Sequence, residues 1–269
     1  MSVRVHPVTD LVSLLDLEPV KPDAFLGAGP VLGWGRIYGG QVVAQALRAA
    51  ARTVDTDQHP HSLHSYFVRA GDEREPVLYE VERVRDGRSF TTRQVVAYQA
   101  GGAILNLIAS FQRHEDGEDV QSVTPPAGVP EPDSVPDGET DLFLHHRVVR
   151  TQREPEPEQV SWIRVAEPLP ADDPFVHACA LAYLSDEDLL GVALLPHSLG
   201  GDWDRLMTAS LDHAVWFHRP VDATEWLLVD AHGHGVANAR GMAVARVFDR
   251  QGRHVATVAQ EGLVRVRQS

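Results

Sequence analysis

The first half of the chain carries an apolar run at residues 42–51, directly after the pair Gly39-Gly40. The run is rich in Ala and Leu and contains no Pro, so together with Gly39-Gly40-Gln41, which opens it, it predicts a buried helix of about four turns. Four later segments have the composition of strands: residues 62–68, 77–85, 89–98 and 103–112. The pair Asp86-Gly87, between the second and third of these segments, predicts a tight hairpin.

The second half repeats this order of a helix followed by strands. The sequence Asp172-Asp173-Pro174 predicts the start of a helix at residues 175–185, because Asp caps a helix and Pro is tolerated in its first turn. That helix is mostly apolar, so we expect it to be buried. Strands are expected at residues 209–218, 226–231, 237–248 and 254–266. A buried helix followed by antiparallel strands predicts an α+β fold in which a sheet wraps round one helix.

The two halves also resemble each other in sequence. A single shift of 150 positions aligns Phe67-Val68-Arg69 with Phe217-His218-Arg219. The same shift, without a gap, aligns Gly102 with Gly252. Because one shift matches several landmarks, it indicates an internal duplication.

Residues 115–141 separate the two halves. This segment holds nine carboxylates and five prolines and contains no Lys or Arg. Proline disfavours helices and central strands, and the like charges repel one another, so the segment predicts an extended, solvated linker. We therefore expect domains at residues 8–114 and 142–269, joined by an acidic, Pro-rich linker at residues 115–141. A second Pro-rich stretch, residues 154–157, predicts a loop.

Charge and cysteine content narrow the class of protein. The chain has 269 residues and a formal net charge of −14, which argues against a nucleic-acid partner and against an anionic membrane surface. Its one cysteine, Cys179, excludes an intramolecular disulfide and a Cys-based zinc cage and fits a reducing compartment. No stretch approaches the ~18 apolar residues of a spanning helix, and residues 1–20 lack the pattern of a secretory signal. We expect a cytoplasmic protein.

Two sequence patterns resemble a catalytic site and a metal site, but a loop and solvent-facing histidines explain them better. The segment at residues 197–201 resembles a nucleophile elbow around Ser198, but Pro196 occupies the first glycine position and the segment follows a helix, so it predicts a loop. Four histidines in the second half, His213, His218, His232 and His234, lack a further ligand at metal-site spacing. We expect histidines at strand ends that face solvent, and no metal.

Four arginines flank the predicted hairpin turn, namely Arg83, Arg85, Arg88 and Arg93. They predict either a positive patch for an anionic ligand or an ordinary charged strand face, and the sequence leaves both interpretations open.

Three polar residues occupy unusual positions in the second half. Asp186 ends the apolar helix, where the negative end of the helix dipole disfavours a carboxylate. Ser210 lies near the start of a predicted strand, and Gln260 lies inside the last one. Taken singly, each is typical of a structural residue.

At these residues the sequence resembles the type II acyl-CoA thioesterase family. The motifs that carry the resemblance are GGQVVAQA (39–46), HSLHSYF (61–67), RDGRSF (85–90), AYLSD (182–186), SLDH with WFHRP (210–213 and 216–220) and VAQEG (258–262). They extend the resemblance over residues 11–267. The resemblance implies a double hotdog, in which two helix-wrapping antiparallel sheets form a pseudo-dimer within one chain.

The resemblance also implies the chemistry. By position in the motifs, Asp186, Ser210 and Gln260 are the catalytic residues, with Ser in a place that is Thr in some members. Asp186 activates a water that Ser210 and Gln260 orient, so no cofactor and no metal is needed. The 150-position shift maps Gln260 onto Ser110 and Asp186 onto Arg36, so we expect one active site for each pseudo-dimer.

The first half is then expected to supply binding surface for the acyl-CoA substrate. The residues of its motifs that we assign to substrate binding are Gly40, His64, Arg88 and Ser89. His64 and the pair Asp212-His213 match family motifs and either line the site or have packing or hydrogen-bonded structural roles. Family analogy suggests a homo-oligomer, either a dimer or a tetramer. Two other functions share the same fold: a non-catalytic acyl-CoA-binding protein, and an enoyl-CoA hydratase, which requires an Asp/His pair on one helix.

Overall fold

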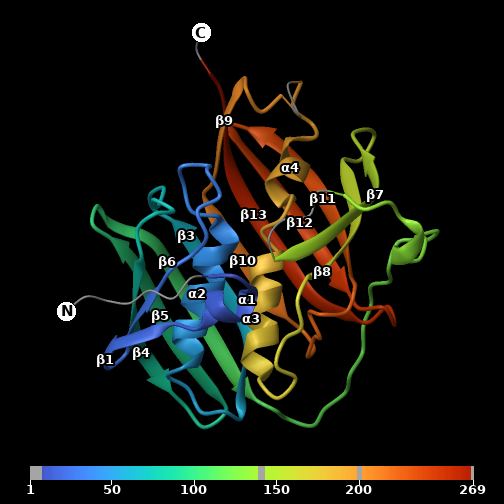
Figure 1. The fold of residues 1–269 in the computed structure, drawn as a ribbon. Coiled ribbons are helices and arrows are strands. Elements are labelled where there is room, and N and C mark those ends of the chain that lie inside the picture. The colour runs from blue at the N-terminus through green and yellow to red at the C-terminus, as the bar shows by residue number, and fades with distance from the viewer. Residues whose placement is uncertain (1–7, 139–142, 199–201, 268–269) are drawn as a thin grey trace. The chain divides into compact units, whose positions relative to one another are not determined.

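The computed structural model describes residues 8–138, 143–198 and 202–267 (Figure 1). The chain forms two compact units. The first contains Met1–Gly117 and Glu167–Tyr183, and the second contains Glu118–Ala166 and Leu184–Ser269. Each unit is an antiparallel sheet with few helices, which fits the predicted α+β class. Among the described residues, none of the helices combines the length and the apolar character that crossing a bilayer requires.

The first unit holds a six-stranded sheet in the order β1-β2-β4-β5-β6-β3. Helix α2 packs on β4, β5 and β6. The elements of this unit are α1 (Leu11–Leu15), β1 (Glu18–Lys21), β2 (Ala24–Gly27), α2 (Gly39–Ala51), β3 (Gln58–Phe67), β4 (Val77–Asp86), β5 (Phe90–Gln99), β6 (Gly102–Arg113) and most of α3 (Pro174–Leu184). The predicted helix, its four strands and the hairpin at Asp86-Gly87 are confirmed.

Helix α2 forms the centre of the first core, as its Ala-rich sequence predicts. Val43 and Leu47 are completely buried, and so is the one amide between them, Gln45. Gln45 Nε2 donates to the carbonyl oxygen of Leu14 at 2.7 Å, and the hydroxyl of Tyr79 donates to Gln45 Oε1 at 2.7 Å. The buried amide is therefore compatible with the core, because its polar atoms have partners.

The second unit repeats the strand order of the first, as β7-β8-β11-β12-β13-β10, and β9 also pairs with β13. Helix α4 packs on β11, β12 and β13. The elements are η1 (Pro132–Ser134), β7 (Leu144–Gln152), β8 (Glu158–Val165), α4 (Leu189–Leu194), β9 (Leu206–Ser210), β10 (Asp212–Phe217), β11 (Leu227–Ala237), β12 (Arg240–Phe248) and β13 (His254–Val266). The predicted strand at residues 209–218 is divided in two, and the predicted loop at residues 154–157 joins β7 to β8.

Similar hydrogen bonds occur in the two units, with donors 150 positions apart and acceptors 151 positions apart. The amide of Val68 donates to the carbonyl of Ile104 at 2.8 Å, and the amide of His218 donates to the carbonyl of Val255 at 2.8 Å. Gly102 and Gly252 both have positive φ angles, of 106° and 75°. The two units therefore share local geometry as well as strand order.

The helix predicted at residues 175–185 forms, but it does not occupy the predicted place. Asp173 caps α3, since its Oδ1 accepts from the amides of Phe175 and Val176 at 3.0 and 3.2 Å. Residues 167–183 belong to the first compact unit, where Asp173 pairs with Arg48 at 2.9 Å. The helix on the second sheet is instead α4, which is not among the elements expected from the sequence. The 150-position shift places residues 39–44 of α2 on residues 189–194 of α4.

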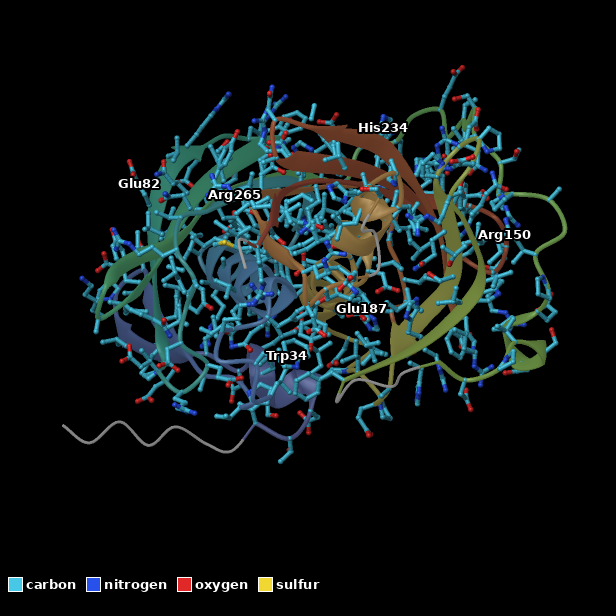
Figure 2. The ribbon with its side chains drawn as sticks, turned by 90° about the horizontal axis from the view of Figure 1, so that it is seen from above. Trp34, Glu82, Arg150, Glu187, His234 and Arg265 are labelled. Atoms are coloured by element: carbon cyan, nitrogen blue, oxygen red, sulfur yellow. The ribbon has the colours of Figure 1, made fainter. Side chains whose placement is uncertain are left out.

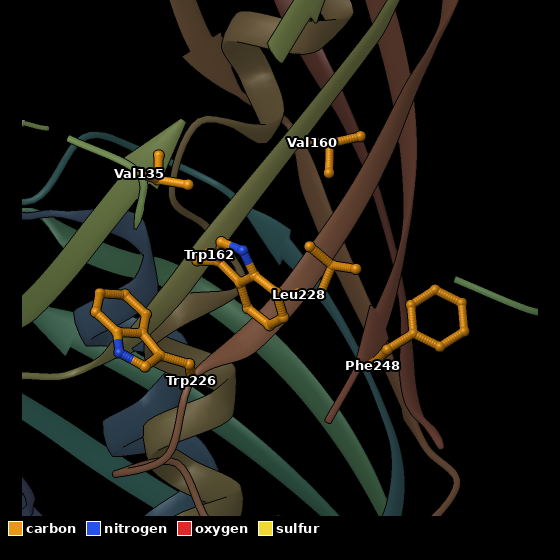
Figure 3. Close-up of a cluster of buried hydrophobic side chains, with 6 residues drawn as sticks. All are labelled: Val135, Val160, Trp162, Trp226, Leu228 and Phe248. Carbon is orange, nitrogen blue, oxygen red and sulfur yellow. The ribbon is translucent and has the colours of Figure 1, made fainter. Parts of the chain in front are cut away.

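The acidic segment is not a solvated linker over its whole length. Val135 is 7% exposed and joins a cluster with Val160, Trp162, Trp226, Leu228 and Phe248 (Figure 3). Trp162 Nε1 donates to the carbonyl of Pro130 at 3.0 Å. Some of the segment's charges also have partners, since Arg147 lies 2.7 Å from Asp137 and Arg250 lies 2.9 Å from Glu131. Burial of its apolar residues therefore fixes part of the segment on the second unit; its last residues, 139–141, lie outside the described residues.

Candidate active site

The three polar residues singled out in the second half come together within the second unit. Gln260 Nε2 donates to Oδ1 of Asp186 at 2.7 Å and to Oγ of Ser210 at 2.7 Å. These partners precede Gln260 by 74 and 50 residues, so the contact depends on the tertiary fold. A carboxylate, a hydroxyl and an amide at this spacing are able to bind and deprotonate a water molecule.

Strand pairing positions Ser210 and Gln260. Strand β13 pairs with β12 on one side, where Gln260 faces Ala243, and with β9 on the other, where Gly262 faces Ser210. A Cβ at Gly262 would collide with Cδ1 of Leu190, so glycine leaves room for this side chain of α4 beside Ser210. Between β9 and β10, the amide of Leu211 donates to the carbonyl of Glu261 at 2.9 Å, which holds the end of β9 against β13.

Asp186 lies in the short connection between α3 and α4. Two residues later, Asp188 adopts a left-handed conformation, with φ of 56°, and Gln159 Nε2 donates to its Oδ2 at 2.8 Å. The amide of Val192 donates to the Asp188 carbonyl at 3.0 Å and so ties the connection to α4. The side chain of Asp186 is 6% exposed, so its carboxylate depends on hydrogen bonds such as the one from Gln260.

A fourth residue, His213, belongs to this group. It is completely buried, its Nε2 lies 2.8 Å from Oγ of Ser185, and its Nδ1 lies 3.8 Å from Oδ1 of Asp186. Burial lowers the pKa of His213 to about 4, so the ring is neutral at neutral pH. The expectation of a solvent-facing histidine is wrong here. Side chains alternate between the two faces of a strand, and His213 shares a face of β10 with the buried Val215. This pattern in the sequence would have predicted that His213 is buried.

Gln260 itself is 1% exposed. Among the described residues, its Oε1 has no hydrogen-bond partner. A buried amide oxygen without a partner is costly in a purely structural setting, whereas such an oxygen is useful where a water or a substrate group binds. Gln260 therefore has the properties of a functional residue.

The four predicted substrate-binding residues lie in the first unit on three elements. Gly40 is in the first turn of α2, where a Cβ would lie 2.5 Å from the carbonyl oxygen of Tyr183, so close packing alone accounts for the glycine. His64 is exposed on β3. Arg88, which is exposed, and Ser89 lie in the loop between β4 and β5. Their roles in substrate binding stay predictions.

The four hairpin arginines do not form one positive patch. Arg93 is 1% exposed and donates through Nε to Oγ1 of Thr53 at 2.8 Å and through Nη2 to Asp86 at 2.5 Å. Arg83 pairs with Asp23 at 2.9 Å. A buried arginine and an ion-paired one have structural roles, so the positive-patch interpretation is wrong for these two residues.

The remaining histidines have separate surroundings. His218 Nε2 lies 2.9 Å from Oγ1 of Thr257, and His234 is exposed (Figure 2). Of the nucleophile-elbow segment, Ser198 is exposed, and residues 199–201 lie outside the described residues.

One group of side chains has metal-ligand spacing within the described part of the chain, namely Glu158, Asp230 and His232. Both oxygens of Glu158 accept from Arg150, at 2.9 and 3.0 Å, and Arg246 lies 4.0 Å from Asp230. Each carboxylate therefore already faces a cation, which is typical of an ion-pair network.

Comparisons with known proteins match both halves of the chain to acyl-CoA thioesterases. A family model described as "Acyl-CoA thioesterase" matches residues 140–263, and one described as "Acyl-CoA thioesterase N-terminal domain" matches residues 30–112. The chain is 37% identical to human acyl-coenzyme A thioesterase 8, over 96% of this chain and 89% of that protein. It is 35% identical to acyl-CoA thioesterase 2 of Haemophilus influenzae, over 96% of this chain and 98% of that protein.

Solved structures give the same result. The crystal structure of an acyl-CoA thioesterase II from Mycobacterium marinum is 40% identical in sequence and superposes with a TM-score of 0.85, covering 96% of this chain and 99% of that one. A protein described as having a hot dog fold, from Alicyclobacillus acidocaldarius, superposes with a TM-score of 0.76 at 22% identity, covering 96% of this chain and 98% of that one. The second likeness concerns the fold alone.

Proposed function

The chain belongs to the acyl-CoA thioesterase family and is a thioester hydrolase, and on that premise we propose that it converts fatty acyl-CoA and water into a fatty acid and CoA. The observation that carries the proposed mechanism is the pair of 2.7 Å hydrogen bonds from Gln260 Nε2 to Asp186 and Ser210. These three residues are the proposed catalytic residues.

In the proposed mechanism, Asp186 acts as a general base. The water oxygen attacks the carbonyl carbon of the thioester while Asp186 accepts a proton from the water. The tetrahedral intermediate then breaks its C–S bond, and the proton on Asp186 neutralises the departing CoA thiolate. Gln260 already donates to Oδ1 of Asp186, which lowers the basicity of that oxygen, so we assign proton transfer to Oδ2.

Ser210 and Gln260 hold the water in this mechanism. A thioester carbonyl is electrophilic enough to react without a covalent nucleophile, so the protein's contribution is to orient and deprotonate water. General-base catalysis is typically worth ~10²–10⁴-fold, and orientation adds to that factor. The buried Oε1 of Gln260 supports this role, because it is an acceptor to which no described residue donates a hydrogen bond.

We further propose that each unit is a hotdog and that the two form a pseudo-dimer with one active site. The shared strand order, and the packing of α2 and α4 on corresponding strands, support this architecture. In the first unit, Ser110 occupies the position that the 150-residue shift assigns to Gln260, and its Oγ lies 2.7 Å from Nε2 of His61. The first unit therefore lacks the same three residues and is proposed to supply binding surface.

Two alternatives on the same fold are a non-catalytic acyl-CoA-binding protein and an enoyl-CoA hydratase. Three of the proteins named above, from human, Haemophilus influenzae and Mycobacterium marinum, are named acyl-CoA thioesterases, which favours hydrolysis. We also propose a cytoplasmic location and a homo-oligomer, either a dimer or a tetramer. Light scattering coupled to size-exclusion chromatography tests the assembly, and a mass of 29.6 kDa would contradict it.

The test of the mechanism is CoA release from palmitoyl-CoA and from short-chain acyl-CoAs. We expect release by the wild type and a kcat at least ~10²-fold lower for Asp186→Asn. The matched control is Asp204→Asn, since Asp204 is an exposed carboxylate of the same unit. Equal rates for Asp186→Asn and the wild type would remove Asp186 from the mechanism. A wild type that releases no CoA would favour the binding protein, and one that adds water to an enoyl-CoA would favour the hydratase.

A further inference from the structure

His213 contacts two consecutive residues of the connection that carries the proposed base. Its Nε2 lies 2.8 Å from the Ser185 hydroxyl oxygen, and its Nδ1 lies 3.8 Å from Oδ1 of Asp186. The ring is completely buried on β10, so neighbouring atoms restrict its rotation. One rigid ring therefore interacts with both Ser185 and Asp186.

The surroundings of the ring determine which nitrogen carries its proton. An unprotonated Nδ1 would direct a lone pair at the Asp186 carboxylate, which is electrostatically unfavourable. A proton on Nδ1 avoids this repulsion, and its interaction with Oδ1 is then that of an N–H dipole with a charge, because 3.8 Å is too long for a hydrogen bond. In that neutral tautomer Nε2 is an acceptor, and the Ser185 hydroxyl donates to it.

We propose that His213 is a positioning residue for Asp186: in its Nδ1–H tautomer it anchors Ser185 through Nε2 and orients the Asp186 carboxylate through Nδ1. This role rests on the proposed function of Asp186 as the base. His213 and Gln260 then act on the same oxygen, Oδ1, from separate strands, β10 and β13. The carboxylate is held in one orientation by both, and His213 itself transfers no proton.

Three variants separate the two contacts of the ring. In His213→Asn the amide nitrogen takes the place of Nδ1, and in His213→Gln it takes the place of Nε2. We expect His213→Asn to keep kcat within about threefold, and His213→Gln to lose roughly 10²-fold in kcat, because a misplaced catalytic group can cost about that much. Ser185→Ala removes the same contact as His213→Asn and is expected to lose about as much kcat. KM is expected to stay unchanged in all three, since the ring acts through Asp186.

His234→Asn is the matched control, because His234 is an exposed histidine of β11, in the same sheet as β10. Thermal unfolding of each variant separates loss of positioning from loss of folded protein. Wild-type kcat in His213→Gln, beside an inactive Asp186→Asn, would overturn the proposal and leave the proposed function intact. Losses in kcat that only follow the losses in melting temperature would overturn it as well.

A second measurement does not depend on turnover. Nitrogen-15 NMR of the wild type is expected to show His213 as the neutral Nδ1–H tautomer at pH 7, and Asp186→Asn is expected to shift it toward Nε2–H, because the charge that favours the Nδ1 proton is gone. A wild-type ring in the Nε2–H form would overturn the proposal even if CoA release were normal. If the ring is Nδ1–H but no acyl-CoA is hydrolysed, the contact stands and the proposed function of Asp186 fails.

Discussion

Gln260 Nε2 lies 2.7 Å from Oδ1 of Asp186, a residue that precedes it by 74 positions. The amide is 1% exposed and the carboxylate side chain 6% exposed, so water competes little with this hydrogen bond. A buried carboxylate that depends on a neutral donor is sensitive to any charge that replaces the donor. This relationship gives the most direct way to change the proposed base without removing it.

Gln260→Glu is expected to abolish most activity at neutral pH and to move the acid limb of the kcat–pH profile upward. The change puts a second carboxyl group within hydrogen-bond distance of Asp186, and two carboxylates so close share one proton, which raises an apparent pKa of the pair. The measurement is kcat between pH 5 and 10. Gln251→Glu, which adds the same charge at an exposed turn, is the control. If the acid limb of the kcat–pH profile did not shift, residue 260 would not face Asp186.

Ser210→Ala is expected to lower kcat about 5- to 10-fold, which corresponds to the loss of one hydrogen bond of about 1 kcal/mol. Ser210→Thr keeps the hydroxyl group and is expected to retain most of kcat. Ser198→Ala is the matched control, because Ser198 is an exposed serine that we assign to a loop. Steady-state CoA release measures all three variants. Loss of activity in Ser198→Ala with full activity in Ser210→Ala would reverse the assignment.

The sequence predicted most strands because their composition and turn residues are local properties. It did not predict α4, which has only six residues, too few for a hydrophobic period to be recognised. Asp188, before α4, has a left-handed conformation and makes no side-chain cap, so the usual start signal is missing as well. The apolar helix α3 was predicted correctly as a helix, but an all-round apolar surface does not indicate which sheet buries it.

The candidate site was predicted through motif resemblance rather than through physical pattern. Asp186, Ser210 and Gln260 are far apart in sequence, and only the pairing of β9 with β13 brings two of them together. Composition alone also predicted that Arg93 is a surface charge. Its burial depends on the carbonyl and hydroxyl of Thr53, which lies 40 residues away, and no local pattern reports such a contact.

Val135→Ala is expected to lower the free energy of unfolding by about 2 kcal/mol, the usual order for shortening a buried aliphatic side chain. Val135 is 7% exposed and packs in the cluster with Trp162 and Trp226, so the change leaves a cavity beneath the acidic segment. Val120→Ala is the control, since Val120 lies in the same segment and is 78% exposed. Urea unfolding followed by tryptophan fluorescence measures both. Equal stability of the two variants would mean that the segment is a solvated linker after all.

Acid is expected to destabilise the wild type between pH 6.5 and about 4 through His213. Burial lowers the pKa of His213 from 6.5 to about 4, so the unfolded chain binds a proton in this range that the folded protein does not. The contribution to stability is therefore complete above pH 6.5 and is lost as the pH falls, by about 2 kcal/mol at pH 5.

His213→Gln removes the titrating ring, so its free energy of unfolding is expected to fall about 2 kcal/mol less than that of the wild type between pH 7.5 and 5. Urea unfolding at both pH values measures the difference, with His234→Asn as the control because its ring is exposed. Parallel losses in the wild type and His213→Gln would show that the ring titrates normally in the folded protein.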